Sequence, residues 1–136
     1  MNSLKTIFIT GANRGIGLEL VKEALLKNYF VIGTTRKYKK NDALNNIKNQ
    51  NLNVIKLDIS NEKSCIEASN FVNKPIDYLV CNAGINNGYG SFLDEDHSQS
   101  KMLEVLNVNV IGCILTVRNF QKFLNSNSKI ILIVPK

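Results

Sequence analysis

The stretch over residues 6–20 constrains the fold of this chain more than any other. It places a β-branched, apolar run before three glycines, Gly11, Gly15 and Gly17, and a helical apolar pattern after them. A strand that passes through such a turn into a helix leaves free backbone N–H groups and the positive end of the helix dipole at the turn. In an α/β sheet, this arrangement binds the phosphate of a nucleotide.

Strand and helix patterns alternate along the rest of the chain. Strands are predicted over residues 6–10, 30–35, 53–57, 76–81 and 129–134, and helices over residues 15–26, 41–49, 62–72 and 99–123. Asn28 is the predicted stop of the first helix, and Ser60 is the predicted N-cap of the third. The alternation predicts an α/β fold with a Rossmann-like doubly wound parallel sheet in the order 3-2-1-4-5, truncated after strand 5. With 136 residues, 44% of them hydrophobic, we expect one domain over residues 1–136.

Ligands bind such sheets at the carboxyl ends of the strands, where four segments of this chain meet. These segments are the glycine turn 11–17, Arg36, Asp58 and residues 82–84. Within the turn, we expect Gly11 to make the sharp bend, Gly15 to let backbone N–H groups approach a pyrophosphate, and Gly17 to let the helix pack closely on the sheet.

The end of the second strand indicates which dinucleotide the chain prefers. The strand ends in Thr34-Thr35-Arg36-Lys37 and has no carboxylate to bind a ribose 2′-hydroxyl. An arginine there pairs with a 2′-phosphate, and Arg14 in the glycine turn can face the same group. We therefore expect NADP(H) rather than NAD(H). The alternative is that both arginines are solvated surface charges, as we expect for residues 37–40.

Four motifs in order resemble those of the short-chain dehydrogenases/reductases (SDR), with an overall similarity to sniffer-type and C-factor-like carbonyl reductases. Residues 10–17 resemble the TGxxxGxG motif, and Asn82-Ala83-Gly84 resembles the N-A-G after the fourth strand. Residues 57–59 resemble the segment with the adenine-contacting aspartate, and residues 107–112 the N-V-x-G helix segment. The resemblance covers the N-terminal part of the family fold. The expected cofactor-binding residues are Gly11, Asn13, Arg14, Gly15, Ile16, Gly17, Arg36, Asp58, Ile59, Asn82, Ala83 and Gly84.

The resemblance implies hydride transfer between NADPH and a small carbonyl or alcohol substrate, but the proton-donating residues are absent. The family uses a Ser and a Tyr-x-x-x-Lys pair, and no tyrosine in this chain has a lysine four residues later; the tyrosines are Tyr29, Tyr38, Tyr78 and Tyr89. Of the family's catalytic set, the chain contains Asn109, for which the alternative is a satisfied core amide. His97 follows three acidic residues and is expected at the surface.

Three explanations of this incomplete set remain open. In the first, the chain is an N-terminal fragment of a reductase and is inactive as given. In the second, it is a non-catalytic nucleotide-binding or regulatory module. In the third, it is a relative of the nucleotide-sugar epimerases. An apolar edge strand at residues 130–134 favours the fragment, because such edges invite aggregation unless they are covered. Residues 82–84 and the Asn109 segment argue against the epimerase alternative.

Composition and cysteine spacing narrow the remaining partner classes. The net charge is +6, but aromatic residues are not interspersed among the basic residues, so we expect no nucleic acid partner. Cys65, Cys81 and Cys113 are widely spaced, which predicts reduced, buried thiols in a cytoplasmic protein and no metal site. The longest purely apolar run, residues 130–134, is too short to span a membrane, and we expect no signal peptide. The family resemblance implies a homodimer through the helix 99–123.

Overall fold

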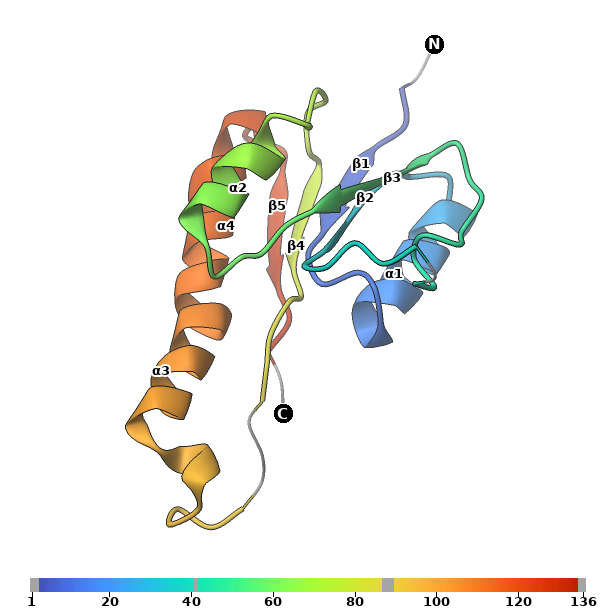
Figure 1. The fold of residues 1–136 in the computed structure, drawn as a ribbon. Helices are drawn as coiled ribbons and strands as arrows, with labels where there is room; N and C mark the ends of the chain where they lie inside the picture. Colours follow the sequence, from blue (N-terminus) through green and yellow to red (C-terminus); the bar gives the residue numbers. More distant parts are fainter. Residues whose placement is uncertain (1–2, 41, 87–89, 135–136) are drawn as a thin grey trace.

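The computed structural model describes residues 3–40, 42–86 and 90–134; Asn41 of the predicted second helix and Tyr89 lie outside the described residues. Five parallel strands form one sheet in the order β3-β2-β1-β4-β5, which confirms the predicted Rossmann-like topology (Figure 1). The strands are β1 (Thr6–Ile9), β2 (Phe30–Thr35), β3 (Leu52–Lys56), β4 (Tyr78–Cys81) and β5 (Lys129–Leu132). Helix α1 (Gly15–Leu26) covers one face, and α2 (Glu62–Ser69) and α4 (Gly112–Phe120) cover the other (Figure 1).

Helix α1 begins and ends as the sequence predicts. Its buried face consists of Gly17, Val21 and Ala24, at helical spacing. The helix stops because Asn28 adopts a left-handed conformation with a φ of 59°. The Tyr29 N–H then donates to the Ala24 carbonyl at 3.0 Å, and the Asn28 N–H donates to Leu25, which is the bonding pattern of a Schellman motif.

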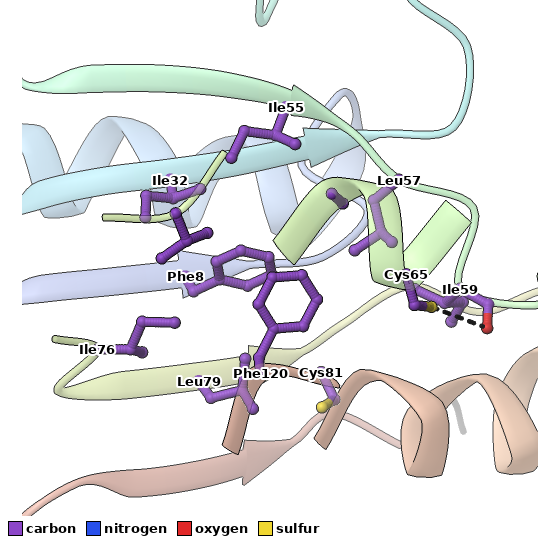
Figure 2. Packing of buried hydrophobic residues seen from close by; sticks show 12 residues of the cluster. Phe8, Ile32, Ile55, Leu57, Ile59, Cys65, Ile76, Leu79, Cys81 and Phe120 are labelled. Carbon is purple, nitrogen blue, oxygen red and sulfur yellow. Dashed lines mark hydrogen bonds between the residues drawn. The ribbon is translucent and has the colours of Figure 1, made fainter. Parts of the chain in front are cut away.

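The sheet carries a hydrophobic cluster on each face. The cluster under α2 and α4 centres on Phe8 and Phe120, whose ring centroids lie 4.5 Å apart (Figure 2). The cluster under α1 joins Ile9, Val31 and Val80 to helix residues. Continuous apolar strands are expected wherever helices cover both faces of a parallel sheet.

Two local predictions are wrong. Residues 43–46 form turns instead of a helix, because Asn45 Nδ2 donates to the Lys39 carbonyl at 2.8 Å and such side-chain bonds compete with helix formation. Asn61, not Ser60, caps α2: its Oδ1 accepts from the Ser64 N–H at 3.1 Å. The Ser60 hydroxyl donates instead to Asp58 Oδ1 at 2.6 Å.

The predicted helix over residues 99–123 is continuous but changes its winding along its length. It begins as α3 (Gln99–Leu106), becomes a π-helical segment (Asn107–Ile111), continues as α4, and ends in a 3₁₀ turn (Gln121–Phe123). Within the described residues, this is the one helix that is long and apolar enough to cross a membrane by length and composition alone. Its α4 half buries Gly112, Thr116 and Phe120 against the rest of the fold.

Strand β5 forms the open edge of the described sheet. It pairs with β4 from Tyr78–Lys129 to Cys81–Leu132, and its other edge has no partner among the described residues. Ile130, Ile131 and Leu132 are all more than 40% exposed. The expected apolar edge strand is therefore present in the structure.

Candidate functional site

A cavity of about 680 Å³ lies at the carboxyl ends of the strands. It collects eleven of the twelve residues expected to hold the cofactor, and the twelfth, Gly17, lies outside the lining. The eleven are Gly11, Asn13, Arg14, Gly15, Ile16, Arg36, Asp58, Ile59, Asn82, Ala83 and Gly84. Segments that are far apart in the sequence therefore meet at one site.

Gly11 and Gly15 are required by the shape of the turn, for different reasons. Both have positive φ values, +63° at Gly11 and +56° at Gly15. A Cβ on Gly11 would lie 2.8 Å from the Ala83 Cα, so the first turn also packs tightly against the chain after β4. A Cβ on Gly15 would meet nothing within 4 Å, so the cavity is open above the backbone at this point.

Gly17 has a packing role instead. A Cβ at this position would overlap the Gly11 carbonyl oxygen and lie 2.6 Å from Asn82 Nδ2. The absence of a side chain lets α1 pack directly on the turn. This geometry agrees with the role expected for Gly17, although the residue does not line the cavity itself.

Thr10 and Asn82 fasten the glycine turn to β4. Asn82 Nδ2 donates to the carbonyls of Thr10 and Gly11, each at 3.1 Å. The Thr10 hydroxyl accepts from the N–H groups of Asn82 and Ala83, both at 3.0 Å. Thr10 was not among the predicted site residues; its place directly before Gly11, where the strand ends, is the signal that could have found it.

Asp58 and Ile59 form the wall of the cavity beyond β3. Asp58 Oδ1 accepts from both the N–H and the hydroxyl of Ser60, which fixes the carboxylate in a local turn. Ile59 is 6% exposed, and a Cβ on Gly112 would lie 2.8 Å from its side chain. Gly112 thereby lets α4 approach the segment that carries Asp58.

The wall beside the end of β2 is basic. Arg14 from the glycine turn and Arg36 from the end of β2 line the same cavity, together with Lys37, Lys39, Asp42 and Asp58. Residues 37–40 are exposed, as expected for a solvated face, and Lys37 and Lys39 also line the cavity. Four cations and two carboxylates leave a positive balance at this wall, which favours an anionic ligand.

Asn109 lies beside the cavity, and both ends of its amide are hydrogen-bonded. Its Oδ1 accepts from the Ile85 N–H, and its Nδ2 donates to the Ile85 carbonyl, both at 2.8 Å. A Cβ on Gly84 would lie 3.2 Å from Asn109 Oδ1. The half-buried side chain therefore holds the segment after β4 in place from the π-helical segment.

The other titratable candidates lie apart from the cavity. His97 is half-buried, packs its ring 5.7 Å from that of Phe92, and has an Nδ1 atom with no hydrogen-bond partner in the structure. Cys65 and Cys81 are buried, Cys113 is half-buried, and all three are free. Residues 3–40, 42–86 and 90–134 contain no cluster of three or more His, Cys, Asp or Glu side chains that could hold a metal ion.

Comparison with solved structures places this fold beside known oxidoreductases. The carbonyl reductase Sniffer of Caenorhabditis elegans matches 97% of this chain with a TM-score of 0.84 and 26% identity. A short-chain dehydrogenase/reductase from Burkholderia multivorans with bound NADP matches 96% of it with a TM-score of 0.84 and 22% identity, which shows the fold alone. A short-chain dehydrogenase from Leptospira borgpetersenii with bound NAD⁺ matches 88% with a TM-score of 0.71 and 30% identity.

Sequence comparison leads to the same group of proteins. The WW domain-containing oxidoreductase of Gallus gallus is 34% identical over 134 residues, which are 91% of this chain and 31% of that protein. The chain spans less than two thirds of each of these solved structures and less than half the length of the curated relatives it matches. The model of the short chain dehydrogenase family matches residues 5–134. The chain therefore belongs to the short-chain dehydrogenase family.

Proposed function

We propose that the chain is the NADP(H)-binding portion of a short-chain oxidoreductase that transfers hydride between NADPH and a small carbonyl or alcohol substrate. The observation that carries the proposal is that the glycine turn, Arg14 and Arg36 line one cavity from separate elements. NADPH, when bound, supplies the hydride. The residues of this chain bind and orient the dinucleotide.

The cavity suits a dinucleotide phosphate. The space above Gly15 is open, because a Cβ there would meet nothing within 4 Å, and α1 begins at this residue. The first N–H groups of α1 and its dipole favour an anion at that point. In our proposal, the pyrophosphate lies over Asn13, Gly15 and Ile16, while Asp58 and Ile59 flank the adenine.

The 2′-phosphate is assigned to the basic wall. The guanidinium groups of Arg14 and Arg36 are suited to bidentate contact with a phosphate, and Lys37 adds a further positive charge. The preference for NADP(H) rests on these residues. It does not rest on the comparisons, because the matched structures include one with NADP and another with NAD⁺.

In this proposal, Asn82, Ala83 and Gly84 complete the opposite wall, and Asn109 supports it from beside the cavity. Asn109 acts as a positioning residue, because both ends of its amide bond the main chain of Ile85 directly after Gly84. A fixed wall at this point limits where the rest of the dinucleotide lies. Asn109 therefore contributes to the site through the backbone it holds.

The 136 residues contain no Tyr-x-x-x-Lys pair, so we propose that they bind NADPH without reducing carbonyl compounds on their own. The same absence favours the alternative function, a non-catalytic nucleotide-binding or regulatory module. Carbonyl-dependent oxidation of NADPH distinguishes the two when it is measured on this chain and on any longer product of the same gene. Activity that appears only with the longer polypeptide supports the oxidoreductase.

The outer side of the long helix supports a homodimer, with a second copy packed on residues 99–123. Leu103, Leu106 and Ile114 are each more than half exposed on this helix. We also propose a cytoplasmic location, which the three free cysteines support.

Reversal of one charge tests the cofactor assignment. Arg36→Asp should weaken NADPH binding and strengthen NADH binding, so that the ratio of the two dissociation constants shifts by about tenfold or more. Lys48→Asp, an equal charge change at an exposed residue outside the cavity lining, is the matched control. An unchanged ratio in the Arg36 variant would refute the role of this residue.

A further inference from the structure

The chain that follows β2 brings two charged residues to the dinucleotide cavity. Lys39 and Asp42 both line it, although β2 ends at Thr35. Lys39 is exposed and Asp42 is half-buried, and neither forms a salt bridge within the part of the chain that the structure describes. A lysine without a carboxylate partner beside an anion-binding cavity can pair with the ligand itself.

Leu44 anchors residues 42–46 beside the glycine turn. Its side chain is fully buried in the cluster under α1. Gly33 of β2 leaves room for it, because a Cβ on Gly33 would lie 3.3 Å from both Leu44 Cδ1 and the Ala12 Cβ. Ala12 belongs to the glycine turn, and its N–H donates to the Thr34 carbonyl at 2.8 Å. Residues 42–46 are therefore packed against the strand that also supports the glycine turn.

Two hydrogen bonds hold the main chain of Lys39 to this anchored segment. The Lys39 carbonyl accepts from Asn45 Nδ2 at 2.8 Å and from the Asp42 N–H at 3.1 Å. The Asp42 carbonyl in turn accepts from the Asn46 N–H at 3.1 Å. The half-buried Asn45 side chain thus joins Lys39 directly to the residue after Leu44. Without this amide, Lys39 would be held less firmly at the cavity.

We propose that Lys39 and residues 42–46 form a specificity element for the phosphorylated dinucleotide. In it, Lys39 pairs with the 2′-phosphate, and Asn45 is the positioning residue that holds Lys39 at the cavity. This inference rests on the proposed binding of NADP(H) and adds a further segment to the two arginines of the basic wall. Asp42 lines the same cavity and opposes the attraction, because its carboxylate repels a phosphate.

Changes of charge at Lys39 and Asp42 should shift the cofactor preference in opposite directions. The readout is the ratio of the dissociation constants for NADH and NADPH, each measured by nicotinamide fluorescence on the whole chain. Lys39→Gln should lower this ratio by about threefold, and Asp42→Asn should raise it by a similar factor. Lys40→Gln is the matched control, because it removes the same charge from the next residue, which is exposed and lies outside the cavity lining.

A double variant tests whether Asn45 acts through Lys39. Asn45→Ala should lower the ratio in the wild-type background and have no further effect in Lys39→Gln. Asn49→Ala is its control, because it removes a bond of the same kind, from the Asn51 N–H to Asn49 Oδ1 at 2.9 Å, away from the cavity lining. A merely structural role for Asn45 would lower the urea midpoint or weaken both dinucleotides equally, and would leave the ratio unchanged.

The outcomes separate this inference from the proposed function. A wild-type chain that prefers NADPH, with the same ratio in Lys39→Gln, would overturn the inference and leave the roles of Arg14 and Arg36 intact. Equal affinities of the wild type for NADPH and NADH would overturn both. Additive losses in the double variant would overturn the positioning role of Asn45. Lys39→Gln changes an exposed residue, so the ratio can be measured even if Asn45→Ala lowers the stability.

Discussion

Alanine substitution at Gly11 and at Gly15 should separate the two functions of the glycine turn. Both residues have positive φ values, which cost an alanine about 1–2 kcal/mol, partly offset by about 0.4–1 kcal/mol from the stiffer unfolded chain. Gly15→Ala should therefore lower the free energy of unfolding by about 1 kcal/mol. At Gly11, the new Cβ would also lie 2.8 Å from the Ala83 Cα. Overpacking against backbone adds about 1–3 kcal/mol, so Gly11→Ala should cost about 2–4 kcal/mol in total.

The expected order reverses for binding. The methyl group of Gly15→Ala enters open space at the cavity wall, where we place the pyrophosphate, and should weaken NADPH binding by about tenfold or more, or about 1.4 kcal/mol. Urea unfolding followed by circular dichroism measures stability, and NADPH fluorescence measures affinity. Gly15→Ala should thus lose less stability than Gly11→Ala, yet it should bind NADPH poorly. Equal losses of stability at both positions, or unchanged NADPH affinity in Gly15→Ala, would refute the reasoning.

Two further changes test the surroundings of the cavity. Asn109→Ala should lower the free energy of unfolding by about 2–4 kcal/mol, because it leaves the Ile85 N–H and carbonyl unpaired. Asn107→Ala is the control, because it loses only a 3.5 Å bond to the Ser60 carbonyl. Equal urea midpoints in the two variants would contradict the role of Asn109. Burial raises the pKa of Cys65 to about 11, with help from the negative charges of Asp58 and Glu62. The folded chain therefore holds this proton more tightly than the unfolded chain. The stability that the protonated thiol contributes below about pH 9 should be lost as the pH rises toward 11. If the free energy of unfolding of Cys65→Ala falls as steeply as that of the wild type across this pH range, the decline has another origin.

The order of the strands and the position of the cavity could be predicted from the sequence because their signals are local and repeated. Apolar strands, a helical pattern after Gly15, and Asn28 at a helix end each depend on neighbouring residues. Right-handed crossovers then leave few topologies, and the predicted sheet order is the one observed. The strand ends carry the cavity residues, so their meeting follows from the topology.

The errors arise where side chains choose between partners that the sequence alone does not rank. Ser60 and Asn61 are both good N-caps, and Asp58 decides between them by accepting the Ser60 hydroxyl. Lys37 and Lys39 are exposed, as the sequence predicts, but only the folded chain shows that they also line the cavity. The bonds from Asn109 to Ile85 join residues that are 24 positions apart, and only the folded backbone shows that both ends of the amide are used.

The most direct test of the central claim is a titration of the wild-type chain with NADPH and with NADH. The chain contains no tryptophan, so the fluorescence of the reduced nicotinamide can be followed without interference from indole emission. If Arg14 and Arg36 hold a 2′-phosphate in this cavity, NADPH should bind about tenfold or more tightly than NADH, a difference of at least about 1.4 kcal/mol. Equal dissociation constants for the two dinucleotides would contradict the account.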